Sequence, residues 1–374
     1  MRWLPGIVCV LLAAAVAAEN ACLVQLYPVK VENKWGYVDR NGKIVIKPRF
    51  DGAGDFYEGL AAVEKNDRIG YIDEQGKVVI PLRFSLTYRF YEGLAAVVVK
   101  DGEGFINRQG RMVIKPDFTF ASYFQEGLAG VIQDFRSGFI NHDGKFVIEP
   151  KYGLVTHFSE GVALIINNHH WGAINREGKV IVLPQYDFMR DYSEGMSAVL
   201  KIYDECYDRW GFLNAEGSPA IWFQFRKAYS FHEGVAAVRD AESNLMGFIN
   251  KSGDYVIPPQ FDQAHSFQEG LAPVCTNGYW GFIDHSGTMA VEPDYEEVIN
   301  YINGICPVRL DDKWGFIDKT GKNITNIEYD DVKPPSQDLF PVRVGKCWGF
   351  VDNTGELVIE PRFAAAGDYL VSPY

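Results

Sequence analysis

The sequence predicts an all-β protein made of ten tandem repeats of about 34 residues. Three observations support this fold class: a glycine recurs at a nearly fixed period, a turn signature follows each copy, and no stretch shows the periodicity of an amphipathic helix. The spacing is 34 residues throughout, except for steps of 39 and 36 after the fifth and sixth copies. The repeat glycines are Gly36, Gly70, Gly104, Gly138, Gly172, Gly211, Gly247, Gly281, Gly315 and Gly349.

The turn within each repeat is defined by an Asp or Asn three residues after the repeat glycine and a second glycine six residues after it. In the first copy these are Asp39 and Gly42. An Asx side chain caps a type I turn, and a glycine closes it in the left-handed conformation, so the pattern predicts a β-hairpin. The predicted structural turn glycines are Gly42, Gly76, Gly110, Gly144, Gly178, Gly217, Gly253, Gly287, Gly321 and Gly355.

Three strands are predicted in each repeat. In the second copy the first strand covers residues 60–63 and follows a Phe-x-Glu-Gly turn; in the first copy, residues 35–38 precede the hairpin and residues 44–46 follow it. An aromatic residue stands fourteen positions after every repeat glycine, as at Phe50, and we expect it in the core. The middle strand is apolar on both faces, which indicates that neighbouring units cover both sides of each small sheet.

Two arrangements of such units are possible. We expect an open, stacked superhelix of three-stranded meanders, because ten units exceed the four to eight blades of common propellers and the array starts and ends in phase. A β-propeller-like ring, or two five-bladed rings, is the alternative.

The N-terminus has the pattern of a secretory signal at residues 1–18, with Arg2 before an apolar run that ends in small residues. A short lead-in at 19–25 and a repeat domain at 26–374 follow. We therefore expect an exported protein, periplasmic or extracellular, with no integral membrane segment. Loss of Arg2 takes the formal net charge from −13 to −14, which disfavours nucleic acid as a partner.

The unit resembles the WG, or KWG, repeat of bacterial exported proteins. Lys34-Trp35-Gly36, Lys313-Trp314-Gly315 and Cys347-Trp348-Gly349 carry the motif, and the resemblance extends over about residues 26–369. Four copies depart at the tryptophan position, with Ile69, Glu103, Ser137 and Met246. The resemblance implies a β-rich repeat array and no particular activity.

The tryptophan position is the candidate contact surface. A position that accepts Trp, Ile, Met, Ser and Glu is not expected in deep core, so its tryptophans are interpreted as a partly exposed row; the alternative is that each shields a hairpin edge. The longest insertion in the array directly precedes Trp210 and adds two tyrosines. The candidate partner-binding residues are Trp35, Trp171, Trp210, Trp280, Trp314, Trp348, Tyr203 and Tyr207.

No residue pattern indicates catalysis, a metal or a cofactor. The recurring glutamates, such as Glu58 and Glu92, fit a turn role, because a catalytic acid needs surroundings unlike those of its copies. His169 and His170 are adjacent on a strand and therefore point to opposite faces. We expect a non-enzymatic exported binding or scaffold protein that contacts an envelope or extracellular protein; glycan or cell-wall polysaccharide binding through the Trp row is the alternative.

Overall fold

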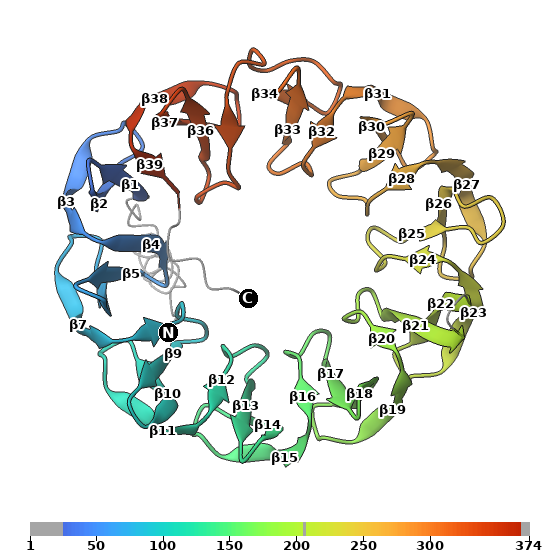
Figure 1. The fold of residues 1–374 in the computed structure, drawn as a ribbon, viewed down its shortest axis with the longest axis horizontal. Coiled ribbons are helices and arrows are strands. Elements are labelled where there is room, and N and C mark those ends of the chain that lie inside the picture. Colours follow the sequence, from blue (N-terminus) through green and yellow to red (C-terminus); the bar gives the residue numbers. More distant parts are fainter. Residues whose placement is uncertain (1–24, 205–206, 368–374) are drawn as a thin grey trace, which may run out of the picture.

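A computed structural model describes residues 25–204 and 207–367. Within these residues the chain forms ten β-sheets, nine with four strands and one with three. The sheets stand side by side as blades around one closed ring (Figure 1). The all-β prediction with ten repeats is confirmed. The predicted signal (1–18) and residues 19–24 of the lead-in lie outside the described residues.

Each blade runs from a short inner strand to a longer outer strand (Figure 1). The strands of blades 1 to 3 are β39 (Ala365–Ala366), β1 (Tyr27–Val31), β2 (Lys34–Val38) and β3 (Ile44–Phe50); β4 (Gly52–Tyr57), β5 (Leu60–Lys65), β6 (Arg68–Ile72) and β7 (Val78–Phe84); β8 (Leu86–Thr87), β9 (Leu94–Val99), β10 (Gly102–Asn107) and β11 (Met112–Phe118). Those of blades 4 to 6 are β12 (Phe120–Ala121), β13 (Ala129–Gln133), β14 (Arg136–Ile140) and β15 (Phe146–Tyr152); β16 (Leu154–Val155), β17 (Val162–Asn167), β18 (His170–Asn175) and β19 (Val180–Tyr186); β20 (Phe188–Met189), β21 (Met196–Asp204), β22 (Tyr207–Asn214) and β23 (Pro219–Phe225).

The remaining blades follow the same order. They contain β24 (Lys227–Ala228), β25 (Ala236–Arg239), β26 (Met246–Ile249) and β27 (Tyr255–Phe261); β28 (Gln263–Ala264), β29 (Ala272–Thr276), β30 (Tyr279–Ile283) and β31 (Met289–Tyr295); β32 (Glu297–Val298), β33 (Ile305–Leu310) and β34 (Lys313–Asp318); β35 (Asp331–Val332), β36 (Phe340–Val344), β37 (Cys347–Val351) and β38 (Leu357–Phe363).

The ring closes through a blade assembled from both ends of the described chain. β39, which follows the outer strand of blade 10, pairs with β1 of blade 1 at Val29–Ala366 and Lys30–Ala365. The expected open superhelix is therefore wrong, as are two five-bladed rings, and the ring alternative holds. The meander is also four-stranded in most blades, because the stretch after each recurring aromatic contributes an inner strand to the next blade, six residues long in β4 and two residues long elsewhere.

Both types of recurring glycine occupy positions that a side chain would not fit. A Cβ atom at Gly36 would lie 2.4 Å from the Ile46 carbonyl oxygen on the paired strand, where the register shifts. The turn glycines have φ between +73° and +88°. They also receive a side chain from the preceding blade: a Cβ at Gly110 would lie 3.0 Å from Cγ2 of Ile80. The same contact joins Ile359 of blade 10 to Gly42 of blade 1, so this apolar contact recurs at the interface that closes the ring.

The core lies between blades. Trp35 and Tyr37 of blade 1, for example, share a buried cluster with Ala53 and Ile72 of blade 2. The aromatic residue fourteen positions after each repeat glycine is buried in all ten copies, as expected. Apolar side chains on both faces of each sheet are therefore covered by the adjacent blades.

Candidate functional site

The Glu-Gly turns form a chain of contacts from blade to blade. Glu126 and Gly127 both have positive φ, +52° and +77°, which makes a two-residue type I′ hairpin. Glutamate rarely adopts such a φ. Here its carboxylate accepts a hydrogen bond from the backbone N–H of Gly161 in the next blade, at 3.1 Å. The carboxylates that make this contact are Glu58, Glu92, Glu126, Glu160, Glu194, Glu233 and Glu269.

Basic side chains reinforce six of these seven turns. Lys251 of blade 7 donates to the Glu194 carbonyl at 2.8 Å and pairs with its carboxylate at 3.2 Å. His142 and His285 pair with the carboxylates of Glu92 and Glu233. Burial opposes ionisation of Glu194, but hydrogen bonds from Gly234 and Lys251 outweigh it and lower the pKa of this carboxyl. The repeated glutamates thus join the blades together.

The position before each repeat glycine, which we call the Trp slot, lies between two blades. Trp210 of blade 6 packs on Phe188 from the inner strand of its own blade. Trp171 of blade 5 packs on the same Phe188, which for that residue belongs to the next blade. A side chain in the slot is therefore held between the inner strand of its own blade and that of the following blade.

The predicted row of partly exposed tryptophans is wrong for three of its six members. Trp35, Trp210 and Trp348 are buried, with 1 %, 8 % and 7 % of their surface exposed. The reason is the ring: the next blade covers the edge that an isolated meander would leave open. The side chains that remain half-buried are Trp171, Trp280 and Trp314.

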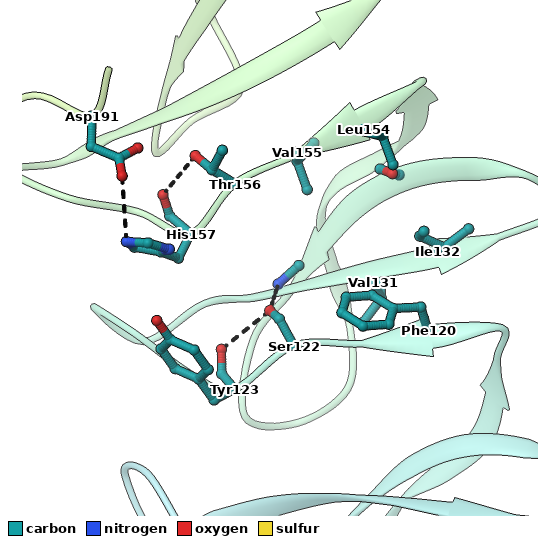
Figure 2. A pocket seen from close by; sticks show the side chains of 12 residues that line it. Phe120, Ser122, Tyr123, Val131, Ile132, Leu154, Val155, Thr156, His157 and Asp191 are labelled. Carbon is teal, nitrogen blue, oxygen red and sulfur yellow. Dashed lines mark hydrogen bonds and ion pairs between the residues drawn. The ribbon is translucent and has the colours of Figure 1, made fainter. Parts of the chain in front are cut away.

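Blade 4 carries Ser137 in its Trp slot, and a cavity of about 400 Å³ opens there (Figure 2). Phe120 and Ser122 line it from blade 4, and Leu154 and Val155 line it from blade 5. Gly130, which also lines the cavity, replaces the alanine found at the same position of several other copies, such as Ala62 and Ala96.

One end of this cavity is apolar and the other is polar (Figure 2). At the polar end the His157 ring lies 3.9 Å from the Asp191 carboxylate, and Tyr123 faces His157 with 6.0 Å between ring centroids. Burial, together with the charges of Tyr91 and Asp191, raises the pKa of the Tyr123 hydroxyl. Sequence reasoning missed this cavity, although Ser137 in place of tryptophan was its signal.

Comparison with known proteins identifies the repeat. The family model for the WG containing repeat matches ten segments, at residues 35–68, 69–102, 104–134, 138–168, 171–201, 210–241, 246–280, 280–314, 314–346 and 348–371. The chain belongs to the WG-repeat family. No curated protein matches it.

Solved structures resemble this WG-repeat ring in fold alone. A crystal structure of a eukaryotic initiation factor is similar with a TM-score of 0.52 and 12 % identity, over 93 % of this chain and 98 % of that one. The structure of dihydro-heme d1 dehydrogenase NirN has a TM-score of 0.36 and 13 % identity, over 71 % of this chain and 72 % of that one. The extracellular domain of a B. thetaiotaomicron protein described as a hybrid two-component system has a TM-score of 0.26 and 9 % identity, over 91 % of this chain and 57 % of that one.

A second candidate surface lies on the rim of blades 5 and 6. Leu183 on β19 and Trp222 on β23 are 67 % and 70 % exposed, and Ile202 and Tyr203 near the end of β21 are 50 % and 51 % exposed. We call these four residues the rim patch. The side chain of Tyr207 is not among those described.

A ring contact joins two strands of the rim patch. The rings of Tyr186 on β19 and Phe223 on β23 stack with 5.8 Å between centroids. Burial raises the pKa of the Tyr186 hydroxyl, and the nearby Tyr203 acts in the same direction.

The described residues, 25–204 and 207–367, contain neither a metal-binding cluster nor a membrane-spanning helix. No group of three His, Cys, Asp or Glu side chains there gathers closely enough to hold a metal ion. Over the same described part of the chain, no helix has the length and apolar character needed to cross a bilayer. Cys275 and Cys306 are free and buried, whereas Cys22 and Cys206 lie outside the described residues.

Proposed function

We propose that this WG-repeat ring is a non-enzymatic, exported scaffold that binds an envelope or extracellular protein through the rim patch. The observation that supports it is the exposure of Leu183, Ile202, Tyr203 and Trp222 on two adjacent blades. Large exposed apolar side chains that gather on one part of a surface are typical of interaction sites, and Trp and Tyr are frequent anchors there.

Two features of the chain fit this proposal. The five extra residues between Gly172 and Gly211 lengthen the β21–β22 hairpin, so the insertion adds contact surface without entering the core. The carboxylates of the Glu-Gly turns bind backbone N–H groups of the next blade, and this structural role fits a non-enzymatic protein. Export rests on the pattern of residues 1–18.

A hairpin deletion tests the rim patch. Removing residues 203–207 restores the 34-residue spacing, and we expect a folded ring with an unchanged thermal midpoint, because Ile202 and Tyr203 beside the deletion are exposed. Wild-type and shortened proteins are immobilised and exposed to an envelope extract. A partner retained by the wild type should be lost from the shortened protein and from Trp222→Ser.

The matched control is Tyr279→Ser, which removes a 49 % exposed tyrosine from blade 8 and should retain the partner. Equal retention by all variants contradicts the rim patch. Affinity electrophoresis tests the glycan alternative. This alternative would be favoured if a polysaccharide in the gel slowed migration of the wild type but not of Trp222→Ser.

A further inference from the structure

The cavity between blades 4 and 5 occupies the place that an indole fills elsewhere in the ring. Trp210 contacts Phe188 and Arg190 of its own blade, and the equivalent residues at Ser137 are Phe120 and Ser122, both of which line the cavity. Trp171 contacts Phe188 of the following blade, and the equivalent residue there is Leu154, which also lines it. The walls of a Trp slot are therefore present in blade 4 without the tryptophan.

The walls are suited to an aromatic ring. The serine and threonine hydroxyls in the lining are already bonded to backbone: Ser137 donates to the Gly153 carbonyl, Ser122 to that of Tyr123, and Thr156 to that of His157. What remains toward the cavity is apolar surface at one end, and the His157–Asp191 pair with Tyr123 at the other. An indole has the same division, with an apolar body and one N–H donor.

We propose that this pocket binds a tryptophan side chain of a partner protein, whose indole takes the place of the tryptophan that blade 4 lacks. A volume of about 400 Å³ is within the range of pockets that hold small ligands and leaves room for an indole. The site lies between blades 4 and 5, with Asp191 contributed by blade 6, and it contains no residue of the rim patch.

Phe135 favours a protein as the source of the ring. It stands at the end of the hairpin that carries Ser137, is 93 % exposed, and has φ of +60°, a conformation that is unfavourable for a bulky side chain. The equivalent residues of several other hairpins are polar, such as Asp67 and His169. A partner chain that inserts a ring into the pocket can cover Phe135 as well, which a free aromatic molecule cannot do.

The test uses two ring-bearing probes and the whole protein. Gly-Trp-Gly and free indole are titrated against the wild type by NMR, with Gly-Ala-Gly as the probe that lacks a ring. We expect both ring-bearing probes to bind with Kd of about 1 mM or tighter, as befits ligands of this size, and Gly-Ala-Gly not to bind. The variant Ser137→Trp supplies the missing indole from the chain itself, and should weaken both probes by at least about tenfold.

A second variant covers the case in which Ser137→Trp does not fold. Leu154→Glu places a charge at a 51 % exposed position in the pocket wall and should weaken the probes to the same degree. Leu86→Glu makes the same change at the equivalent position of blade 3, 41 % exposed and away from this pocket, and should leave them unchanged.

Three results would overturn the proposal. Absence of binding by both ring-bearing probes, or equal binding to the wild type and Leu154→Glu, would exclude the site. Binding of indole without Gly-Trp-Gly would show that the mouth does not admit a ring joined to a backbone, and would exclude a partner side chain. Because the readout is binding of the probes, these results are separate from loss of a partner at the rim patch.

Discussion

The interfaces among blades 2 to 9 differ from the interface at which blade 10 meets blade 1. Among blades 2 to 9, the glutamate carboxylate of each Glu-Gly turn binds the backbone N–H of the glycine in the next turn. At the closing interface Asp338 stands in place of the turn glycine. Its carboxylate accepts hydrogen bonds from the Arg40 guanidinium and the Tyr27 hydroxyl.

Apolar packing is the same at both kinds of interface. Ile359 approaches Gly42 as Ile80 approaches Gly110, and a strand arginine donates to the turn glycine carbonyl in both. The repeat therefore supplies a generic contact that any two copies can make. The ion pair between Arg40 and Asp338 is a feature of the closing interface, and we interpret it as a means of distinguishing the closing partner from the other copies.

The largest expected effect concerns the generic contact. Gly110→Val should lower the free energy of unfolding by about 2–4 kcal/mol, because a β-branched residue opposes φ of +73° and its Cβ would crowd Ile80. Gly42→Val should have a similar effect if the packing is common to all interfaces. Urea unfolding followed by tryptophan fluorescence measures both.

Gly345→Val is the control for these glycines. Gly345 has φ of +60° with nothing within 4 Å of an added Cβ, so only the backbone cost of about 1–2 kcal/mol remains. Equal losses at Gly345 and Gly110 would show that packing on the turn glycine contributes nothing.

A smaller effect is expected from the closing ion pair. Arg40→Ala removes a partner of Asp338 and leaves Asp352, whose side chain is 8 % exposed, without the arginine that lies 3.4 Å away. We expect the free energy of unfolding to fall by about 1–2 kcal/mol.

The matched change at an ordinary interface is Glu126→Gln. It should lower the free energy of unfolding by less than about 1 kcal/mol, since the amide oxygen still accepts the Gly161 N–H. Thermal unfolding compares Arg40→Ala with Glu126→Gln. A larger loss of stability for Glu126→Gln would show that the ion pair at the closing interface contributes no more than an ordinary Glu-Gly contact.

The sequence was sufficient for the repeat and its turns, because both follow from local chemistry. Asp39 and Gly42 specify a hairpin within four residues, and ten copies of the pattern confirm one another. Closure of the ring could not be predicted in this way. The strand that closes it, Ala365–Ala366, has two residues and no pattern, and it is a strand only because Val29 and Lys30 lie beside it.

Burial at the Trp slot is also a property of the ring. Trp35 is 1 % exposed because blade 2 covers it, and a single meander does not specify what covers its edge. Ser137 is a visible departure in the sequence, but it becomes a pocket only when Leu154 and Val155 of the next blade complete the walls.

The smallest expected effect concerns Glu103, which fills the Trp slot of blade 3. Its carboxylate accepts the Ala121 N–H at 2.9 Å, yet burial is the larger influence and raises the pKa of this carboxyl. Since the folded protein holds this proton more tightly than the unfolded chain, the contribution of Glu103 to stability is greatest below its unfolded pKa and falls as the pH rises through its folded pKa. The amide of Glu103→Gln carries no charge at any pH and keeps an oxygen for Ala121. The variant should therefore melt about 1–2 °C above the wild type at pH 7.5, and the melting temperatures of the two proteins should converge at pH 4. The gain is small because the side chain is only half-buried.

The control is the same change at Glu126, in a turn, which should give no gain in melting temperature at pH 7.5. A difference for Glu103→Gln that is as large at pH 4 as at pH 7.5 would show that the charge of Glu103 is not its cause.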